Sequence, residues 1–257
     1  MAMNKADFSR TELLIGEKGL QALSKTCIAV IGLGGVGSYS AEALARSGIG
    51  KLILVDFDIV EPSNVNRQIL ALQSTIGKYK ADLMQQRILD INPQAEIVVH
   101  REVLNKDNQE QLLAEADYCV DAIDSLNSKI DLLEFLVRNK KRFISVMGAG
   151  NRLDPNLIHI STLDKSHNCP LARRVRKLLK QREIEINFPC VYSSELPIKP
   201  NQKSNNPSIE HPNISPKIVY NNSQRIPIGS ISYIPAIMGM MASSWVIKSI
   251  LKDSTDN

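Results

Sequence analysis

The stretch G-L-G-G-V-G, residues 32–37, has the spacing of a phosphate-binding turn. Gly32, Gly34 and Gly37 form the pattern G-x-G-x-x-G between a short apolar run and a region of helical periodicity, and Gly35 leaves additional room. In such a turn the first glycine permits a tight bend, the second lets phosphates approach the backbone, and the third lets helix and strand pack closely. The N–H groups at the helix start then face an anion. The glycines alone are equally compatible with a nicotinamide or flavin dehydrogenase.

Polar residues beyond the second predicted strand narrow this choice. Asp56 ends that strand, where a carboxylate can accept hydrogen bonds from ribose hydroxyls, as it does in dehydrogenases. Asp58, Asn66, Arg67 and Gln68 follow in the stretch D-F-D-I-V-E-P-S-N-V-N-R-Q. A guanidinium and two amides here suit a triphosphate, because an arginine neutralises charge on the phosphates and an amide orients their oxygens. A polar, capped surface turn is the alternative, and it explains Arg67 poorly.

Two further charged residues would complete a triphosphate site. Lys80, in G-K-Y-K-A-D at the start of a predicted helix, supplies a mobile positive charge, although Lys78 competes for this role and either is compatible with a solvated helix surface. Asp124, in V-D-A-I-D-S, follows the fourth predicted strand at the edge where open α/β sheets bind ligands. A carboxylate there can hold Mg²⁺ between phosphates. The alternatives are that Asp124 caps the next helix, and that Asp121 is structural.

A strongly basic helix is predicted over Leu171–Arg182. Its cations are Arg173, Arg174, Arg176, Lys177, Lys180 and Arg182. Six cations within ten residues, with no acidic residue before Glu183, suit the phosphate backbone of a nucleic acid. Their spacing distributes charge around much of the helix, so a plain solvated helix is the alternative. We favour an RNA contact.

The four cysteines, Cys27, Cys119, Cys169 and Cys190, lie far apart and form no Cys-x-x-Cys pair. The zinc site built from two such pairs is therefore not expected. Cys27 and Cys119 lie in apolar runs and are interpreted as small buried hydrophobic residues of a reducing cytosol. Cys190 is compatible with a nucleophile that accepts an acyl group, but no histidine is near it in sequence, and a buried structural cysteine is favoured.

The elements that must position these residues alternate between strand and helix. The predicted strands are Thr26–Ile31, Lys51–Phe57, Glu96–Val99, Tyr118–Asp121 and Phe143–Met147, and the predicted helices are Arg10–Ser24, Ser38–Ser47, Lys78–Asn92, Asp107–Glu115 and Leu126–Asn139. This alternation predicts an α/β fold with a Rossmann-like, doubly wound, mostly parallel sheet.

The pattern changes after Gly148-Ala149-Gly150. We therefore predict a nucleotide-binding core over 8–150 and a smaller C-terminal extension over 151–257. The extension comprises predicted strands at Leu157–Leu163 and Cys190–Ser194, the basic helix at Pro170–Arg182, a polar and mobile insertion at 199–224, and a closing core helix at Tyr233–Lys252.

Composition indicates an ordinary globular protein and excludes little. The 257 residues are 43% hydrophobic and 23% charged, with a net charge of +4, which permits a polyanionic partner without requiring one. The N-terminal stretch lacks an apolar segment of signal-peptide type. The apolar run Ile226–Leu251 is interrupted by prolines, glycines and Lys248, so we interpret it as a loop and core helix rather than a membrane span. A cytoplasmic location is expected.

The motifs together resemble a known family. G-L-G-G-V-G, D-F-D, N-V-N-R-Q, K-Y-K-A and D-A-I-D-S, in this order and spacing, are similar to those of the ubiquitin-activating-enzyme-like adenylation superfamily, whose members adenylate a carboxylate. R-T-E-L-L-I-G-E-K-G-L-Q-A-L and C-V-Y-S-S-E resemble one branch more closely, the bacterial tRNA threonylcarbamoyladenosine dehydratases. The resemblance covers about residues 8–195 and the C-terminal helix. The missing zinc pairs of sulfur-carrier-activating relatives also favour the tRNA branch.

The resemblance implies a role for each motif. Asp56 would bind ribose, Asn66, Arg67 and Lys80 the phosphates of ATP, and Asp124 a magnesium ion. A homodimer is implied, and in several relatives an N-terminal arginine of the second subunit reaches the γ-phosphate, for which Arg10 is the nearest candidate. A protein partner from a sulfur relay is also compatible with the family.

The implied reaction is an ATP-dependent loss of water. The threonyl carboxylate of threonylcarbamoyladenosine, beside the tRNA anticodon, would displace pyrophosphate from ATP, and a nitrogen of the same modification would then close a five-membered ring and release AMP. Activation of the C-terminus of a ubiquitin-like sulfur carrier is the alternative enzyme. A nucleotide-sensing scaffold is the alternative outside enzymes, and the combination of Arg67, Lys80 and Asp124 argues against it.

Overall fold

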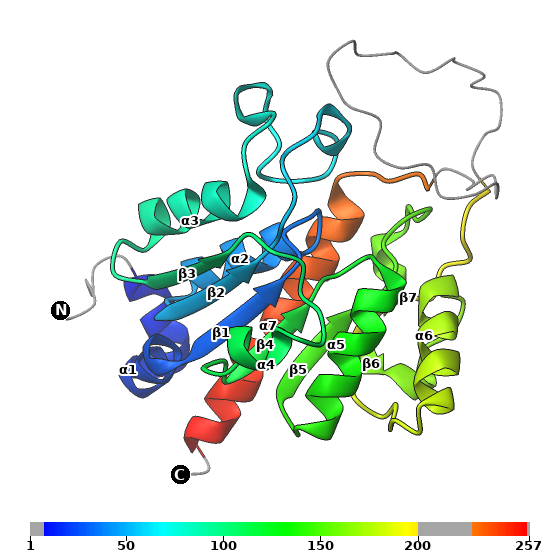
Figure 1. Cartoon of the computed structure of the whole chain (residues 1–257). Coiled ribbons are helices and arrows are strands. Elements are labelled where there is room, and N and C mark those ends of the chain that lie inside the picture. Colours follow the sequence, from blue (N-terminus) through cyan, green and yellow to red (C-terminus); the bar gives the residue numbers. More distant parts are fainter. Residues whose placement is uncertain (1–7, 200–227, 256–257) are drawn as a thin grey trace.

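The computed structural model describes residues 8–199 and 228–255 (Figure 1). Its strands are β1 (Cys27–Ile31), β2 (Lys51–Val55), β3 (Glu96–His100), β4 (Tyr118–Asp121), β5 (Arg142–Val146), β6 (Ile158–Thr162) and β7 (Pro189–Ser193). Its helices are α1 (Ser9–Lys25), α2 (Gly37–Arg46), α3 (Lys80–Ile91), α4 (Gln109–Leu112), α5 (Leu126–Arg138), α6 (Pro170–Gln181) and α7 (Tyr233–Thr255). Almost all of the predicted insertion at 199–224 lies outside the described residues.

The strands form one seven-stranded sheet in the order β3-β2-β1-β4-β5-β7-β6. All neighbouring pairs are parallel except β7 and β6. The predicted Rossmann-like, mostly parallel sheet is therefore confirmed. The two strands that follow residue 150 extend the sheet of the core, with β7 beside β5. The carboxyl ends of β1, β2, β4, β5 and β7 consequently meet at one edge, where the candidate site lies.

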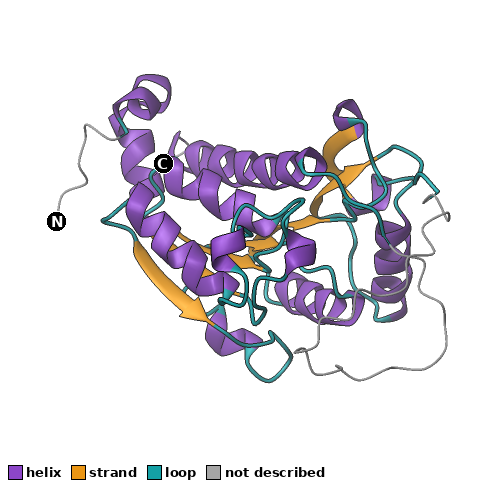
Figure 2. Ribbon diagram, turned by 90° about the horizontal axis from the view of Figure 1, so that it is seen from above, coloured by secondary structure: helices purple, strands orange, loops and turns teal. Residues whose placement is uncertain are grey.

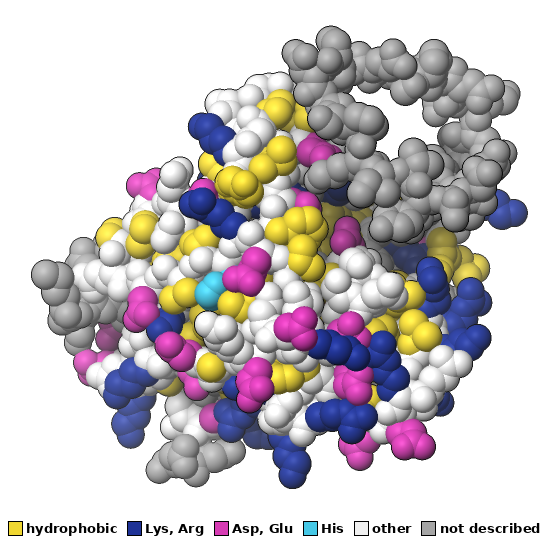
Figure 3. Space-filling model, viewed as in Figure 1, with side chains coloured by type: hydrophobic (Ala, Val, Ile, Leu, Met, Phe, Trp, Pro, Cys, Tyr) yellow, Lys and Arg dark blue, Asp and Glu magenta, His cyan; other side chains and the backbone are white. Residues whose placement is uncertain are grey.

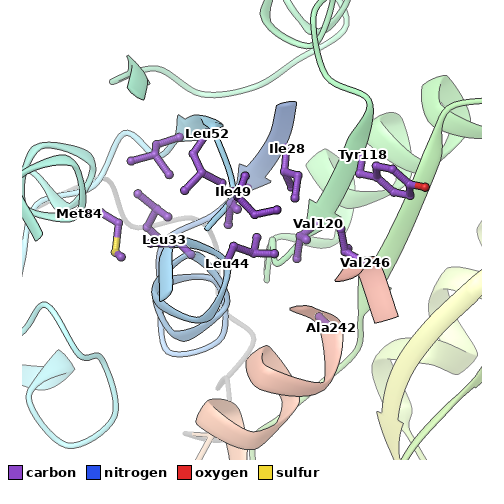
Figure 4. Packing of buried hydrophobic residues seen from close by; sticks show 14 of the residues in the cluster. Ile28, Leu33, Leu44, Ile49, Leu52, Met84, Tyr118, Val120, Ala242 and Val246 are labelled. Atoms are coloured by element: carbon purple, nitrogen blue, oxygen red, sulfur yellow. The ribbon is translucent and has the colours of Figure 1, made fainter. Parts of the chain in front are cut away.

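Helices cover both faces of the sheet (Figure 2). β1 is buried along its whole length, as expected for a central parallel strand, and its side chains alternate between two cores. Ile28 and Val30 pack in the core formed with α1, α2, α3 and α7, whereas Ala29 and Ile31 pack in the core formed with α4, α5 and α6. Figure 4 shows the first core, with Ile28 among the side chains that meet between the sheet and its helices.

The closing helix α7 packs on the first core, as predicted. Five of its buried apolar residues recur every four positions: Ile234, Met238, Ala242, Val246 and Ile250. The crossing with α2 is close, because a Cβ at Gly239 would lie 2.3 Å from the carbonyl oxygen of Val36. Ser40 and Ser243 form a buried hydrogen bond of 2.8 Å at the same crossing. Within the described residues, α7 is also the one helix whose length and apolar composition would suffice to cross a membrane.

Two predicted helices differ from the observed ones. The helix predicted over Arg10–Ser24 is present as α1, but it kinks at Gly16 (φ 71°), and Leu13 and Leu14 before the kink are more than 80% exposed. α4 spans only Gln109–Leu112. The predicted helical turn before it is replaced by asparagine turns, in which the side chains of Asn105 and Asn108 accept backbone N–H bonds within the same few residues.

Candidate functional site

The glycine loop joins β1 to α2 and is pressed against the end of β4. Gly32 has φ +89°, a conformation that favours glycine, and a Cβ there would lie 2.8 Å from the carbonyl oxygen of Ala122. A Cβ at Gly37 would lie 1.7 Å from the carbonyl oxygen of Gly32. Only glycine therefore fits at either position. This tight turn places the first N–H groups of α2 at the carboxyl edge of the sheet, where an anion is favoured.

Asp56 follows β2 and is bonded directly to this loop. Its Oδ2 accepts a hydrogen bond of 2.5 Å from the N–H of Leu33, and its Oδ1 accepts one of 2.8 Å from the N–H of Asp58. Burial raises the pKa of the Asp56 carboxyl, while the nearby charge of Lys80 and the backbone hydrogen bonds from Leu33 and Asp58 act in the opposite direction. Asp56 thus lies beside the glycine loop, and its role as the ribose ligand stays a prediction.

The structure distinguishes between the two candidate lysines. Lys80, the first residue of α3, is buried, and its Nζ lies 3.0 Å from Oδ2 of Asp58. Lys78 is exposed. An ammonium held under the loop and close to Asp56 can present its charge to a bound phosphate, whereas an exposed one is fully hydrated. Of the two lysines, Lys80 is therefore the one that lies close to Asp56 and Asp58, and its role in the site stays a prediction.

Asn66 and Arg67 lie in the turn after the 3₁₀ helix Pro62–Asn64. Nη1 of Arg67 donates to the carbonyl of Ser63 (2.8 Å) and to Oδ1 of Asn66 (2.9 Å). Nδ2 of Asn66 donates to the carbonyl of Ser230 (3.0 Å), which precedes α7. A Cβ at Gly35 would lie 3.3 Å from Cγ of Arg67. The turn therefore lies against the glycine loop at Gly35.

Gln68 completes this side of the site. It is buried, and its Oε1 has no hydrogen-bond partner in the described part of the chain. Its Nε2 lies 3.8 Å from where a Cβ of Gly34 would be. A buried amide oxygen without a partner is costly and is usually satisfied by water or ligand. Gln68 thus keeps an unused acceptor close to the glycine loop.

Asp124 lies in the turn after β4 and is exposed. Ser125 occupies the N-cap position of α5, so the alternative in which Asp124 caps this helix is not supported. The described residues contain no group of three or more His, Cys, Asp or Glu arranged for a metal ion. Mg²⁺ is commonly bound by one or two carboxylates together with substrate phosphates and water. Asp124, a single exposed carboxylate at the carboxyl edge of the sheet, fits that pattern.

The cations of the basic helix α6 fall into two groups. Nη1 of Arg182 pairs with Oδ1 of Asp131 (2.6 Å) and Oε2 of Glu134 (2.7 Å) on α5, and Nη1 of Arg176 donates to the carbonyl of Ser166 (2.7 Å). Both guanidinium groups hold α6 in place. The exposed cations are Arg173, Arg174, Lys177 and Lys180. Figure 3 shows basic side chains gathered on the side of the molecule where α6 lies.

All four cysteines are free and buried, which confirms the structural interpretation of Cys27 and Cys119. Burial raises the pKa of the Cys190 thiol to about 12. A thiol of this kind is inert, because the thiolate is the reactive species. The structure therefore favours a packing role for Cys190 over a nucleophilic one.

Sequence reasoning missed Lys129, which is completely buried beside Asp121. Its Nζ lies 2.6 Å from Oδ2 of Asp121, so the structural interpretation of Asp121 is supported. Nothing local marks Lys129 as buried, except that it occurs one turn into a predicted helix among apolar residues. Arg10 lies in the exposed first turn of α1, and its proposed reach into a second subunit stays a prediction.

A doubly wound sheet with a glycine loop, an acidic residue after the second strand and cations beside them defines a nucleotide-binding α/β protein. The chain belongs to the ThiF family, whose sequence model matches residues 8–257.

Individual relatives agree along nearly the whole chain. It is 39% identical to a tRNA threonylcarbamoyladenosine dehydratase of Bacillus subtilis, over 96% of this chain and 95% of the relative. It is 35% identical to the Escherichia coli protein of that name, over 95% of this chain and 93% of the relative. A solved structure of E. coli tRNA N6-threonylcarbamoyladenosine dehydratase in complex with ATP matches with a TM-score of 0.84 and 32% identity, covering 98% of this chain and 97% of that one.

Proposed function

We propose that this protein is an enzyme that dehydrates threonylcarbamoyladenosine in tRNA at the expense of ATP. One observation carries the proposal. Asp56 is bonded to the glycine loop, Lys80 pairs with Asp58 beside it, and Arg67 packs against the same loop at Gly35. A dehydrogenase needs no cations at this place. The relatives named for this activity, which match almost the whole chain, support the same conclusion.

ATP would lie along the carboxyl edge of the sheet, with its phosphates over the glycine loop and the start of α2. Asp56 would accept hydrogen bonds from the ribose while keeping its backbone bonds to the loop. Asn66 and Gln68 would orient phosphate oxygens. Among the described residues, the guanidinium of Arg67 bonds only to Ser63 and Asn66, both local, so it can turn to a phosphate without disturbing the fold.

The chemistry is an adenylation followed by ring closure. An oxygen of the threonyl carboxylate bonds to the α-phosphorus of ATP, and pyrophosphate leaves with the bonding electrons. Arg67 and Lys80 stabilise the charge that develops on the phosphates. A nitrogen of the modification then attacks the activated carbonyl and loses its proton, and AMP leaves with the former carboxylate oxygen. The net change in the tRNA is the loss of one water.

Ring closure is intramolecular, so the enzyme has only to orient the chain and exclude water. No covalent enzyme intermediate is required, which agrees with a buried and protonated Cys190. Asp124 is the residue that would hold Mg²⁺, and the ion would supply neutralisation of phosphate charge there.

Substrate tRNA would contact the exposed cations of α6 that were defined above. Because Arg176 and Arg182 are engaged within the protein, the contact surface is smaller than the run of six cations indicates. A homodimer in which Arg10 of one subunit approaches the nucleotide of the other, a cytoplasmic location and contact with a sulfur-relay protein are further parts of the proposal.

The test measures, in one reaction, the products formed from ATP and the mass of the modified nucleoside in the tRNA. With tRNA carrying threonylcarbamoyladenosine, the protein should release AMP and pyrophosphate and reduce the mass of the modified nucleoside by one water. Unmodified tRNA is the control and should support neither change. Exchange of pyrophosphate into ATP that depends on a ubiquitin-like carrier, and not on modified tRNA, would identify the alternative enzyme. No nucleotide turnover with either would overturn both.

A further inference from the structure

A completely buried ion pair lies immediately beneath the turn that carries Asp124. Lys129 on α5 is the largest fully buried side chain in the described residues, and Asp121 at the end of β4 is equally inaccessible. The three donors of the Lys129 ammonium are all used: by Oδ2 of Asp121 (2.6 Å), the carbonyl of Val146 (3.1 Å) and Oγ of Ser145 (3.4 Å). The hydroxyl of Ser145 donates in turn to Oδ2 of Asp121 (2.5 Å).

The other oxygen of this carboxylate shapes the turn after β4. Oδ1 of Asp121 accepts the N–H of Ile123 at 3.1 Å, while the N–H of Ala122 donates to the carbonyl of Ile31 at 2.9 Å. Asp124 is the next residue. The same carboxylate is thus bonded to Lys129 and Ser145 through one oxygen and to the backbone beside Asp124 through the other.

The turn is held from the opposite side by the glycine loop. A Cβ at Gly32 would lie 2.8 Å from the carbonyl oxygen of Ala122 and 3.3 Å from the nitrogen of Ile123, and one at Gly37 would lie 3.2 Å from Cβ of Ala122. The backbone at residues 122–123 therefore has little freedom. The Asp121 carboxylate and the glycine loop thus act together on the backbone that leads into Asp124.

Stability alone is a weak explanation for such a pair. Removing two charges from water costs several kcal/mol per ion, and replacement of a buried pair by well-packed apolar residues is often neutral or stabilising. In this geometry the pair fixes an orientation, because it holds the carboxylate of Asp121 toward the backbone N–H of Ile123. Groups hydrogen-bonded directly to a metal ligand typically change metal affinity or activity about 10–100-fold when they are removed, and the low end of that range is the scale for a cluster that acts one residue away.

We propose that Lys129, Asp121 and Ser145 are positioning residues that set the place of the Asp124 carboxylate over the phosphate site. This inference rests on the proposed function, since it assigns the cluster to Mg²⁺-dependent binding of ATP. The cluster touches neither nucleotide nor metal and acts only through the backbone at Ile123.

Two matched double variants separate positioning from stability. D121L/K129M removes both charges and the acceptor for the N–H of Ile123. D121N/K129M removes the same charges but keeps a side-chain oxygen for that N–H. Both should remain folded, because neither leaves a buried charge without its partner. D121L/K129M should melt somewhat lower, because it leaves the N–H of Ile123 and the hydroxyl of Ser145 without their acceptor, so affinities are compared at a temperature where both variants are folded.

The measurement is calorimetric binding of the α,β-methylene analogue of ATP to the full-length protein, with and without Mg²⁺. We expect D121L/K129M to lose about tenfold or more of the affinity gained from Mg²⁺, and to keep its Mg²⁺-free affinity. D121N/K129M should retain most of the gain. Turnover should show the same pattern, with a raised Mg²⁺ concentration for half-maximal rate in the first variant only.

Several outcomes would overturn the inference. Wild-type dependence on Mg²⁺ in both double variants would show that the cluster does not act on Asp124, and equal losses in both would show that the acceptor for Ile123 does not matter. If D121L/K129M does not fold, Ser145→Ala tests the same carboxylate and should reduce the Mg²⁺ gain about threefold, the effect of one hydrogen bond; no change would contradict the proposal. Failure of the wild-type protein to bind the analogue would instead refute the proposed function.

Discussion

The carboxylate of Asp56 accepts a 2.5 Å hydrogen bond from the backbone N–H of Leu33 and thereby connects the end of β2 to the glycine loop. Two neighbouring strands thus present their carboxyl ends as one rigid surface. The carboxylate is buried while it makes this bond, so its ionisation is coupled both to folding and to the shape of the phosphate site.

That coupling predicts a pH dependence. Burial raises the folded-state pKa of Asp56 above its ordinary value of 3.8, so the folded protein binds this proton more readily than the unfolded chain does. The cost of burying the charge is absent below the unfolded pKa and is fully present above the folded pKa. Stability attributable to Asp56 should therefore fall as the pH rises through that interval.

Asp56→Asn removes the ionisation and is the variant to compare. In urea unfolding at a series of pH values, the free energy of unfolding of the wild type, relative to that of Asp56→Asn, should increase as the pH falls from 7 toward 4. A difference that is constant over this range, or that changes in the opposite direction, would contradict the assignment.

Arg67→Ala and Asp124→Ala should abolish adenylation while the fold stays intact. Within the part of the chain that the structure describes, Arg67 makes only local hydrogen bonds and Asp124 is exposed, so neither change disturbs the core. We expect turnover to fall by about 10²–10³-fold or more, the usual effect of removing a charge-stabilising group. Full activity in either variant, with an unchanged thermal melt, would remove that residue from the phosphate site.

The two lysines at the start of α3 provide a matched pair. Lys80→Ala should reduce turnover by about 10²-fold or more, because it removes the buried ammonium beside Asp58. Lys78→Ala removes an exposed charge two residues away and should leave the rate within about twofold, as is usual for a surface change. Equal losses in the two variants would indicate that general charge, and not the position of Lys80, matters.

The exposed cations of α6 should affect tRNA binding and not nucleotide binding. A quadruple variant should weaken tRNA affinity when alanine replaces Arg173, Arg174, Lys177 and Lys180. The slope of log K for tRNA binding against log salt concentration should become shallower by up to about 3. The KM for ATP should not change. Filter binding at several salt concentrations measures the first effect and steady-state kinetics the second.

Arg182→Ala is the control for this helix. It also removes one positive charge, but this charge is paired with Asp131 and Glu134 on α5. The variant should unfold at a somewhat lower temperature, because loss of a partly exposed ion pair lowers the free energy of unfolding by up to about 1 kcal/mol. The salt dependence of its tRNA affinity should stay that of the wild type. The salt-dependence slope of tRNA binding would contradict this if Arg182→Ala changed it by a quarter or more of the change in the quadruple variant. That result would mean that Arg182 also contacts RNA.

The secondary structure was predictable because its signals are local. Apolar runs such as Cys27–Ile31 and the helical spacing within Leu126–Arg138 reflect which faces must be buried, and the alternation of the two implies a parallel sheet. The helix predicted over Asp107–Glu115 is shorter in the structure, because asparagine turns occupy the residues before Gln109. The helix predicted over Arg10–Ser24 is present as α1, with a kink at Gly16 that no local periodicity indicates.

The sequence by itself determined the doubly wound fold, the glycine loop and the set of charged residues at the carboxyl edge, because each depends on spacing within one segment. Only the tertiary structure decided which of those charges face the site. Lys80 is buried and pairs with Asp58, whereas Lys78 is exposed. Arg182 pairs with acidic side chains of α5 and so does not extend the basic surface, and Lys129 pairs with the buried Asp121. In each case, packing between elements settles whether a charged side chain meets an opposite charge or is left exposed to water.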